Sequence, residues 1–167
     1  MEDLSERLFA HFVGGRWRVP FGTEQVPVAH PDGARAGTVV LAEARDVARA
    51  CNILRGADHV ARARAGKALS DLGIPAFDAP MPPANAPVLL NLGTTDPQAL
   101  GVALGAGLGH GLIWCPPPEA ALEATKIALH LQNADLPPGC FALIHAFTPR
   151  TERLIKEFGF QRRASQK

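Results

Sequence analysis

The sequence predicts an α/β fold, with a small Rossmann-like, three-layer parallel sheet that follows an N-terminal β-hairpin region. Three observations indicate this class. Short extended segments separated by glycine and proline turns occupy residues 11–41, apolar runs alternate with helical segments in the second half, and a proline-rich stretch separates the two parts. The chain has 167 residues, 47% of them hydrophobic, which is enough apolar material for a core.

The N-terminal third is predicted to begin as β-structure. The apolar pair Phe12-Val13 and residues 16–19 flank Gly14-Gly15, and two consecutive glycines supply the positive φ angles that a tight hairpin needs. Residues 26–28 and 37–41 are two further extended segments, separated by a turn-forming His-Pro-Asp-Gly sequence.

A single amphipathic helix is predicted over residues 42–66. Its apolar positions recur at helical spacing: Val47, Ala50, Cys51 and Leu54. Its outer face carries arginines: Arg45, Arg49 and Arg55. We interpret these arginines as a solvated face and not as a nucleic-acid surface, because no aromatic residues lie between them.

The proline-rich stretch sets the predicted boundaries. Five prolines between positions 75 and 87 exclude a regular helix or an interior strand. We therefore expect a hairpin, strand and helix region at 1–74, a linker at 75–87, a βαβαβα unit at 88–160 and a tail at 161–167.

In the second half, strands and helices alternate. Strands are predicted at 86–91, 112–114 and 140–144, and helices at 97–107, 118–133 and 149–159. Asp96-Pro97 and Thr148-Pro149 each place a capping residue before a proline at the first helical position. Such a series requires parallel strands with right-handed crossovers.

Composition excludes several partners and compartments. Seventeen basic and sixteen acidic residues leave a formal charge of +1, which offers no field for nucleic acid or anionic lipid. Three cysteines without C-x-x-C spacing, and a charged N-terminus without a long apolar stretch, favour a cytoplasmic protein. Residues 97–118 contain no charged side chain, but five glycines make a membrane span a poor interpretation.

Motifs for chemistry are sparse. The glycines of 105–111 do not fit G-x-G-x-x-G and follow a helix, so they are interpreted as helix termination and close packing. No serine lies in G-x-S-x-G, and no histidines lie at metal-binding spacing, so neither a serine nucleophile nor a metal site is predicted. Cys115 ends a predicted strand at the carboxyl edge of the sheet, where ligands bind; a structural role is favoured, and a nucleophile is the alternative.

Several strings, in order, resemble the aldehyde dehydrogenase superfamily. Residues 12–17, Phe-Val-Gly-Gly-Arg-Trp, are similar to the opening F-I-x-G-x-W hairpin, and 28–33 are similar to V-x-N-P-x-x-G. Residues 109–116, Gly-His-Gly-Leu-Ile-Trp-Cys-Pro, resemble G-N-x-V-V-W-K-P, and 134–139 resemble A-G-L-P-P-G. Residues 37–39 and 46–50 are similar to the strand and the D-V-x-x-A helix that come next in the family. Together these strings extend the resemblance to about two-thirds of the chain.

The resemblance implies a site for NAD or NADP, but this sequence differs from the family at positions of that site. Cys115 stands where the family has the lysine that binds the adenosine ribose; Pro116 follows it, and Glu119 is the counterpart of the next acidic residue. A cysteine has neither the charge nor the reach for that contact. The oxyanion-hole motif P-W-N-F-P has no clear equivalent, since the surroundings of Asn91 differ, and the sequence ends before the family's general base and cysteine nucleophile. No catalytic residue is therefore assigned.

Besides a nucleophilic role of Cys115 toward an acyl or aldehyde group, two functions remain open at this point. The first is a pseudoenzyme: an aldehyde dehydrogenase-like domain that lacks the catalytic part and interacts with itself or with another protein, such as a full-length dehydrogenase. The second is an NAD(P)-binding subunit of an aldehyde oxidoreductase whose catalytic residues lie on another chain. The sequence predicts an oligomer in the first case, because truncation of the fold exposes strand edges and apolar surface.

Overall fold

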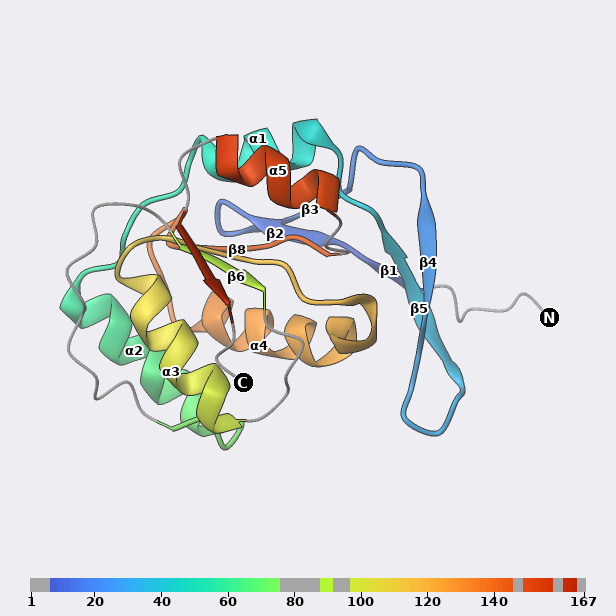
Figure 1. Ribbon diagram of the computed structural model, residues 1–167. Coiled ribbons are helices and arrows are strands. Elements are labelled where there is room, and N and C mark those ends of the chain that lie inside the picture. Colours follow the sequence, from blue (N-terminus) through green and yellow to red (C-terminus); the bar gives the residue numbers. More distant parts are fainter. Residues whose placement is uncertain (1–6, 76–87, 92–96, 146–148, 158–160, 165–167) are drawn as a thin grey trace.

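The computed structural model describes residues 7–75, 88–91, 97–145, 149–157 and 161–164. A six-stranded sheet forms its centre, with helices on both faces and a smaller three-stranded sheet at one side (Figure 1). The strands of the large sheet, in spatial order, are β3 (Arg16–Arg18), β2 (His11–Val13), β8 (Phe141–Leu143), β7 (Leu112–Trp114), β6 (Val88–Asn91) and β9 (Gln161–Ala164).

The large sheet is mixed, which corrects the prediction of a parallel sheet. Strands β8, β7, β6 and β9 run parallel, but β2 pairs antiparallel with β8 at Phe12 and Leu143. The N-terminal hairpin thus continues the sheet and is not a separate region. Strand β9 is a second departure, because it lies in the segment predicted to be a tail and pairs with the far side of β6.

The N-terminal hairpin is confirmed. β2 and β3 are antiparallel, with His11 opposite Arg18 and Val13 opposite Arg16. Gly14 and Gly15 connect them with φ angles of 64° and 74°, the left-handed conformation that a two-residue hairpin loop requires.

The other predicted extended segments form the small sheet. Its order is β1 (Leu8–Phe9), β5 (Arg35–Val40) and β4 (Gln25–Ala29). β4 and β5 are antiparallel, and the turn between them closes with a hydrogen bond from the N–H of Gly33 to the carbonyl of His30, at 2.9 Å.

The single helix predicted at 42–66 is wrong. Two helices occur, α1 (Ala44–Cys51) and α2 (His59–Ser70). Asp58 starts α2 by accepting a hydrogen bond from the N–H of Ala61 at 2.7 Å. Gly56 lies in the break against Gly109, where a Cβ would overlap the Gly109 carbonyl oxygen. Arg55 consequently belongs to a loop.

The remaining helices agree with the sequence. They are α3 (Pro97–Leu108), the 3₁₀ turn η1 (Pro118–Ala120) that leads into α4 (Ala121–Asn133), and α5 (Pro149–Glu157). The capping residues Asp96 and Thr148, and all of the predicted linker except Pro75, lie outside the described residues. No helix in the described part of the chain is long and apolar enough to cross a membrane.

Alternating side chains of the sheet fill two separate cores. Leu112, Trp114, Phe141 and Leu143 face α2, α3 and α4. Ile113, Ala142 and Ile144 face α1 and α5 on the opposite side. The period of two along each strand produces this division, and the helices cover the two faces accordingly (Figure 1).

The loop before β8 provides a test of the backbone geometry. Gly139 has φ +93°, and a Cβ there would overlap the carbonyl oxygen of Ile53. We expect Gly139→Ala to lower the free energy of unfolding by about 2–4 kcal/mol, measured by urea denaturation. Gly33→Ala is the matched control, because Gly33 has φ +87° and open space around it, so only about 1 kcal/mol is expected. Equal losses would contradict the contact with Ile53.

Candidate functional site

The carboxyl end of β7 holds the three positions that the family resemblance assigned to the cofactor. Cys115 is fully buried among Ile113, Ala142, Ile144 and their neighbours in the core beneath α1 and α5. Burial strongly raises the pKa of the Cys115 thiol, and the nearby Cys51 adds to this effect. The thiol of Cys115 is therefore neutral and enclosed by apolar side chains, an environment typical of structural cysteines.

Glu119 lies in a different environment. It is exposed on η1 and lines a groove of about 440 Å³ against residues 26–31 of the β4–β5 hairpin. Pro116 is buried, and neither it nor Cys115 lines this groove. The structure therefore places Glu119 on the surface and Cys115 and Pro116 in the interior, so neither Cys115 nor Pro116 presents an exposed side chain for the ribose contact of NAD or NADP.

Two histidines meet at the same end of the sheet. The backbone N–H of His145, which follows β8, donates to Nδ1 of His11 on β2 at 3.1 Å, and the two rings stack with centroids 6.0 Å apart. Both side chains are fully buried. Because Nδ1 of His11 accepts this hydrogen bond, the neutral ring carries its proton on Nε2.

The proton of His11 faces a buried carboxylate. Nε2 of His11 lies 3.8 Å from Oδ2 of Asp46, the third residue of α1. Asp46 also accepts hydrogen bonds from the N–H groups of Phe21, at 3.1 and 3.2 Å, and Glu43, at 3.1 Å. Arg49 approaches its Oδ1 at 3.2 Å. The hydrogen bonds from Phe21 tie α1 to the segment after β3.

Burial determines the protonation state of both rings. It lowers the pKa of His11 to about 3, and the charge of Arg49 contributes in the same direction. It also lowers the pKa of His145 to about 3, with a further contribution from His11. Both rings are therefore neutral at pH 7. Sequence analysis missed the pair because no local spacing connects residues 134 apart.

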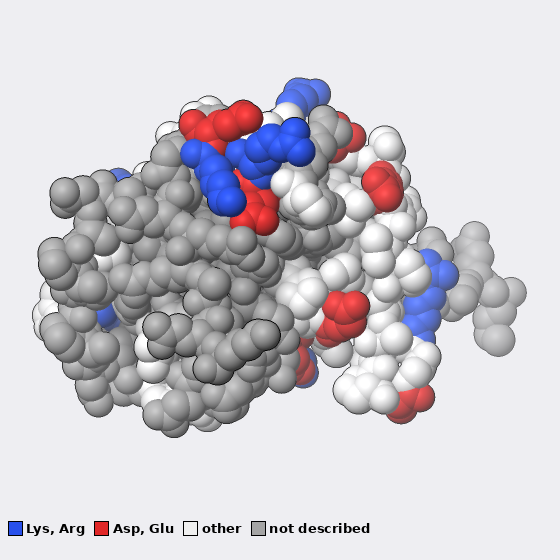
Figure 2. Space-filling model, in the orientation of Figure 1, with Lys and Arg blue, Asp and Glu red and all other residues white. Residues whose placement is uncertain are grey.

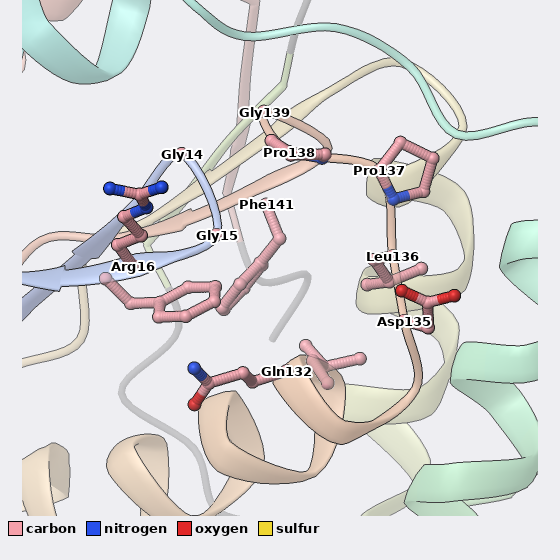
Figure 3. Close-up of a pocket in the computed structure, with 12 residues that line it drawn as sticks. Gly14, Gly15, Arg16, Gln132, Asp135, Leu136, Pro137, Pro138, Gly139 and Phe141 are labelled. Atoms are coloured by element: carbon pink, nitrogen blue, oxygen red, sulfur yellow. The ribbon is translucent and has the colours of Figure 1, made fainter.

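A separate pocket lies at the opposite end of the sheet (Figure 3). The hairpin turn Gly14-Gly15, the loop 135–139 and Gln132 surround it, and Phe12 and Phe141 form part of its lining, with a volume of about 260 Å³. The loop leads into the amino end of β8. Because α/β sheets bind ligands at the carboxyl ends of parallel strands, we place the candidate site at the other edge.

The described residues contain no group of three or more His, Cys, Asp and Glu side chains that could hold a metal ion. The arrangement of His11, Asp46 and His145 thus consists of a carboxylate and two neutral imidazoles, all enclosed.

Comparisons with known proteins identify the fold. No family model and no curated protein matches the chain. Solved structures do match: Δ-pyrroline-5-carboxylate dehydrogenase of Mycobacterium tuberculosis has 18% identity and a TM-score of 0.68, covering 88% of this chain and 39% of that one. The chain has the aldehyde dehydrogenase fold. The resemblance seen in the sequence is confirmed at this level.

Two other aldehyde dehydrogenases support the same conclusion. Aldehyde dehydrogenase C of Pseudomonas syringae, solved with NAD⁺ and octanal, has 15% identity and a TM-score of 0.64 over 90% of this chain and 42% of that one. A putative methylmalonate-semialdehyde dehydrogenase of Sinorhizobium meliloti, solved with NAD, has 14% identity and a TM-score of 0.67 over 96% and 50%. The chain thus spans about half or less of the length of these dehydrogenases, and identities this low establish the fold alone.

The buried histidines predict how stability depends on pH. Histidine in the unfolded chain titrates near pH 6.5, whereas His11 and His145 titrate at about 3 in the folded state. Between these values the unfolded state binds more protons, so the free energy of unfolding should fall as the pH decreases below about 6.5. The expected slope is up to about 1.4 kcal/mol per pH unit for each histidine.

Urea denaturation between pH 7.5 and pH 5 measures this slope. His145→Phe removes one titrating ring and should flatten it, even if the variant is less stable at every pH. His30→Asn, at an exposed position, is the control and should leave the slope unchanged. Identical slopes in wild type and His145→Phe would refute the assignment.

Proposed function

We propose that these 167 residues form a non-catalytic, aldehyde dehydrogenase-like domain that associates with another chain of the same fold. That chain is a second copy of this one or a full-length dehydrogenase. The observation that carries the proposal is an apolar groove beside two strands, each of which is the edge strand of its sheet among the described residues. Leu8, 44% exposed, and Leu129, 39% exposed, line this groove together with Trp17.

The groove lies where an added chain can continue β-structure. β1 ends the small sheet on one side of it, and β3 ends the large sheet on the other. Unpaired edge strands next to exposed apolar side chains favour association, because the partner satisfies the free backbone groups and covers the apolar area. The groove measures about 280 Å³, which is room for one or two side chains.

The state of the cysteines supports a non-catalytic role. Cys115 and Cys140 are fully buried, and burial raises the pKa of both thiols. Burial also raises the pKa of Cys51, which is partly exposed, to about 12. None of the three has the lowered pKa or the cationic neighbour that an activated thiolate requires, apart from a minor effect of Arg55 near Cys140.

Light scattering coupled to gel filtration tests the association. We expect the wild-type chain to be a dimer or larger, and Leu129→Lys to shift it to a monomer, because a charge in the groove opposes burial. Val60→Lys, at an exposed apolar position on α2, is the control and should not change the mass. A monomeric wild type that a full-length dehydrogenase also fails to bind would refute the proposal.

A second candidate function is that of an NAD(P)-binding subunit. The strand order β8-β7-β6-β9 favours it. The strands β6, β7 and β8 follow one another in space as they do in the sequence, and β9 then pairs with the other side of β6. Doubly wound, Rossmann-like sheets have this order. Cys115 in the interior counts against it, since the ribose contact is lost.

Thermal unfolding with NAD⁺ or NADP⁺ separates the two candidates. A cofactor at about a hundred times its dissociation constant stabilises the folded state by roughly 2.7 kcal/mol. For a chain of this size the midpoint should then rise by about 5 to 10 °C. We expect no shift; a shift of this size with either cofactor would establish the nucleotide-binding subunit instead.

A further inference from the structure

Two arginines of α1 lie over one aromatic ring that follows β3, and a third arginine belongs to β3 itself. The guanidinium carbons of Arg45 and Arg49, both on α1, lie 4.1 and 4.7 Å from the centroid of the Phe21 ring. Arg18 on β3 is included in this group, because its Nε is buried without an acceptor and its charge contributes to the lowered pKa of Arg49. The ring holds two of the guanidinium groups in place and reduces the entropy that they would lose on binding a ligand.

Positive charge exceeds negative charge in this group. Asp46 is the carboxylate that pairs with Arg49, and it is fully buried and already accepts two backbone N–H groups. Burial lowers the pKa of Arg49; Asp46 opposes that effect, while Arg18 and Arg45 add to it. Among the described residues, neither Arg18 nor Arg45 forms an ion pair, and Nε of Arg18 and Nε of Arg49 are buried without an acceptor.

We propose that Arg18, Arg45 and Arg49 bind the phosphate group of a small phosphate monoester. The three guanidinium charges outnumber the carboxylates Asp46 and Glu43 at the start of α1, and guanidinium groups recognise phosphate oxygens through pairs of parallel hydrogen bonds. Phe21, 41% exposed, offers an apolar surface to the organic part of the ligand. The proposal is independent of the non-catalytic role and of the apolar groove.

A small ligand fits better than a nucleic acid or a membrane. Both of those need an extended surface of one sign, whereas this chain carries a formal charge of +1. Figure 2 shows acidic and basic side chains side by side over the region of α5, next to α1. The three arginines are therefore a local site at the edge of a surface of mixed charge.

The site lies at the same end of the sheet as the buried histidines. Arg18 is directly opposite His11 in the β2–β3 register, and Asp46 contacts both His11 and Arg49. The carboxyl ends of β7 and β8 are at this edge as well, where the fold places ligands.

Titration calorimetry at constant ionic strength tests the site with phenyl phosphate, inorganic phosphate and acetate. We expect phenyl phosphate to bind at least as tightly as inorganic phosphate, and acetate to give no measurable heat. Arg45→Gln should weaken phenyl phosphate at least about tenfold, because one charge-assisted contact is lost. Arg45 is exposed, so this variant should fold normally, which circular dichroism verifies.

The control is Arg153→Gln on α5, an exposed arginine outside the group, which should bind as the wild type does. Arg45→Lys keeps the charge but not the paired hydrogen bonds, and should bind more weakly than wild type. The proposal would be overturned if phosphate did not bind, or if acetate bound as tightly as phosphate. It would also be overturned if phenyl phosphate did not bind, or if Arg153→Gln weakened binding as much as Arg45→Gln.

Discussion

The antiparallel pairing of β2 with β8, at Phe12 and Leu143, joins the N-terminal and C-terminal halves of the chain into one sheet. Phe12 enters the core beneath α2, α3 and α4, and Val13 enters the core beneath α1 and α5. The same contact brings His11 against His145 and places it 3.8 Å from Asp46 at the start of α1. Without this pairing neither core closes, because each contains side chains from both halves.

Local sequence signals were sufficient to predict most of the helices and strands. Gly14-Gly15 defines the first hairpin, and the short apolar run of β7 and the proline that starts η1 are readable within a few residues. The break between α1 and α2 was missed because it depends on Gly56 meeting Gly109, a contact that no local pattern encodes. β9 was missed because Gln161–Ala164 carries two arginines and has no apolar alternation.

Less of the candidate site than of the fold could be predicted from the sequence. The family motifs located Cys115 at the carboxyl end of β7, but only the structure reveals that the thiol points into a core and that Glu119 faces another groove. The His11–His145 pair and the group formed by Arg18 and Arg49 each combine residues from separate segments. A single sequence does not show that such residues meet, since their meeting results from the tertiary fold.

The path of the chain through residues 8–13 has a consequence for folding during synthesis. β1 pairs with the small sheet and β2 with the large one, so a single short segment belongs to both. The partner of β2 in β8 is distant in the sequence, as the separation of 134 positions between His11 and His145 illustrates. The ribosome therefore has to release β8 before β2 can join the parallel strands of the large sheet. Until then Phe12 lacks Phe141 and Leu143 as neighbours, and the rate of closure should reflect this long-range contact rather than the early formation of helices.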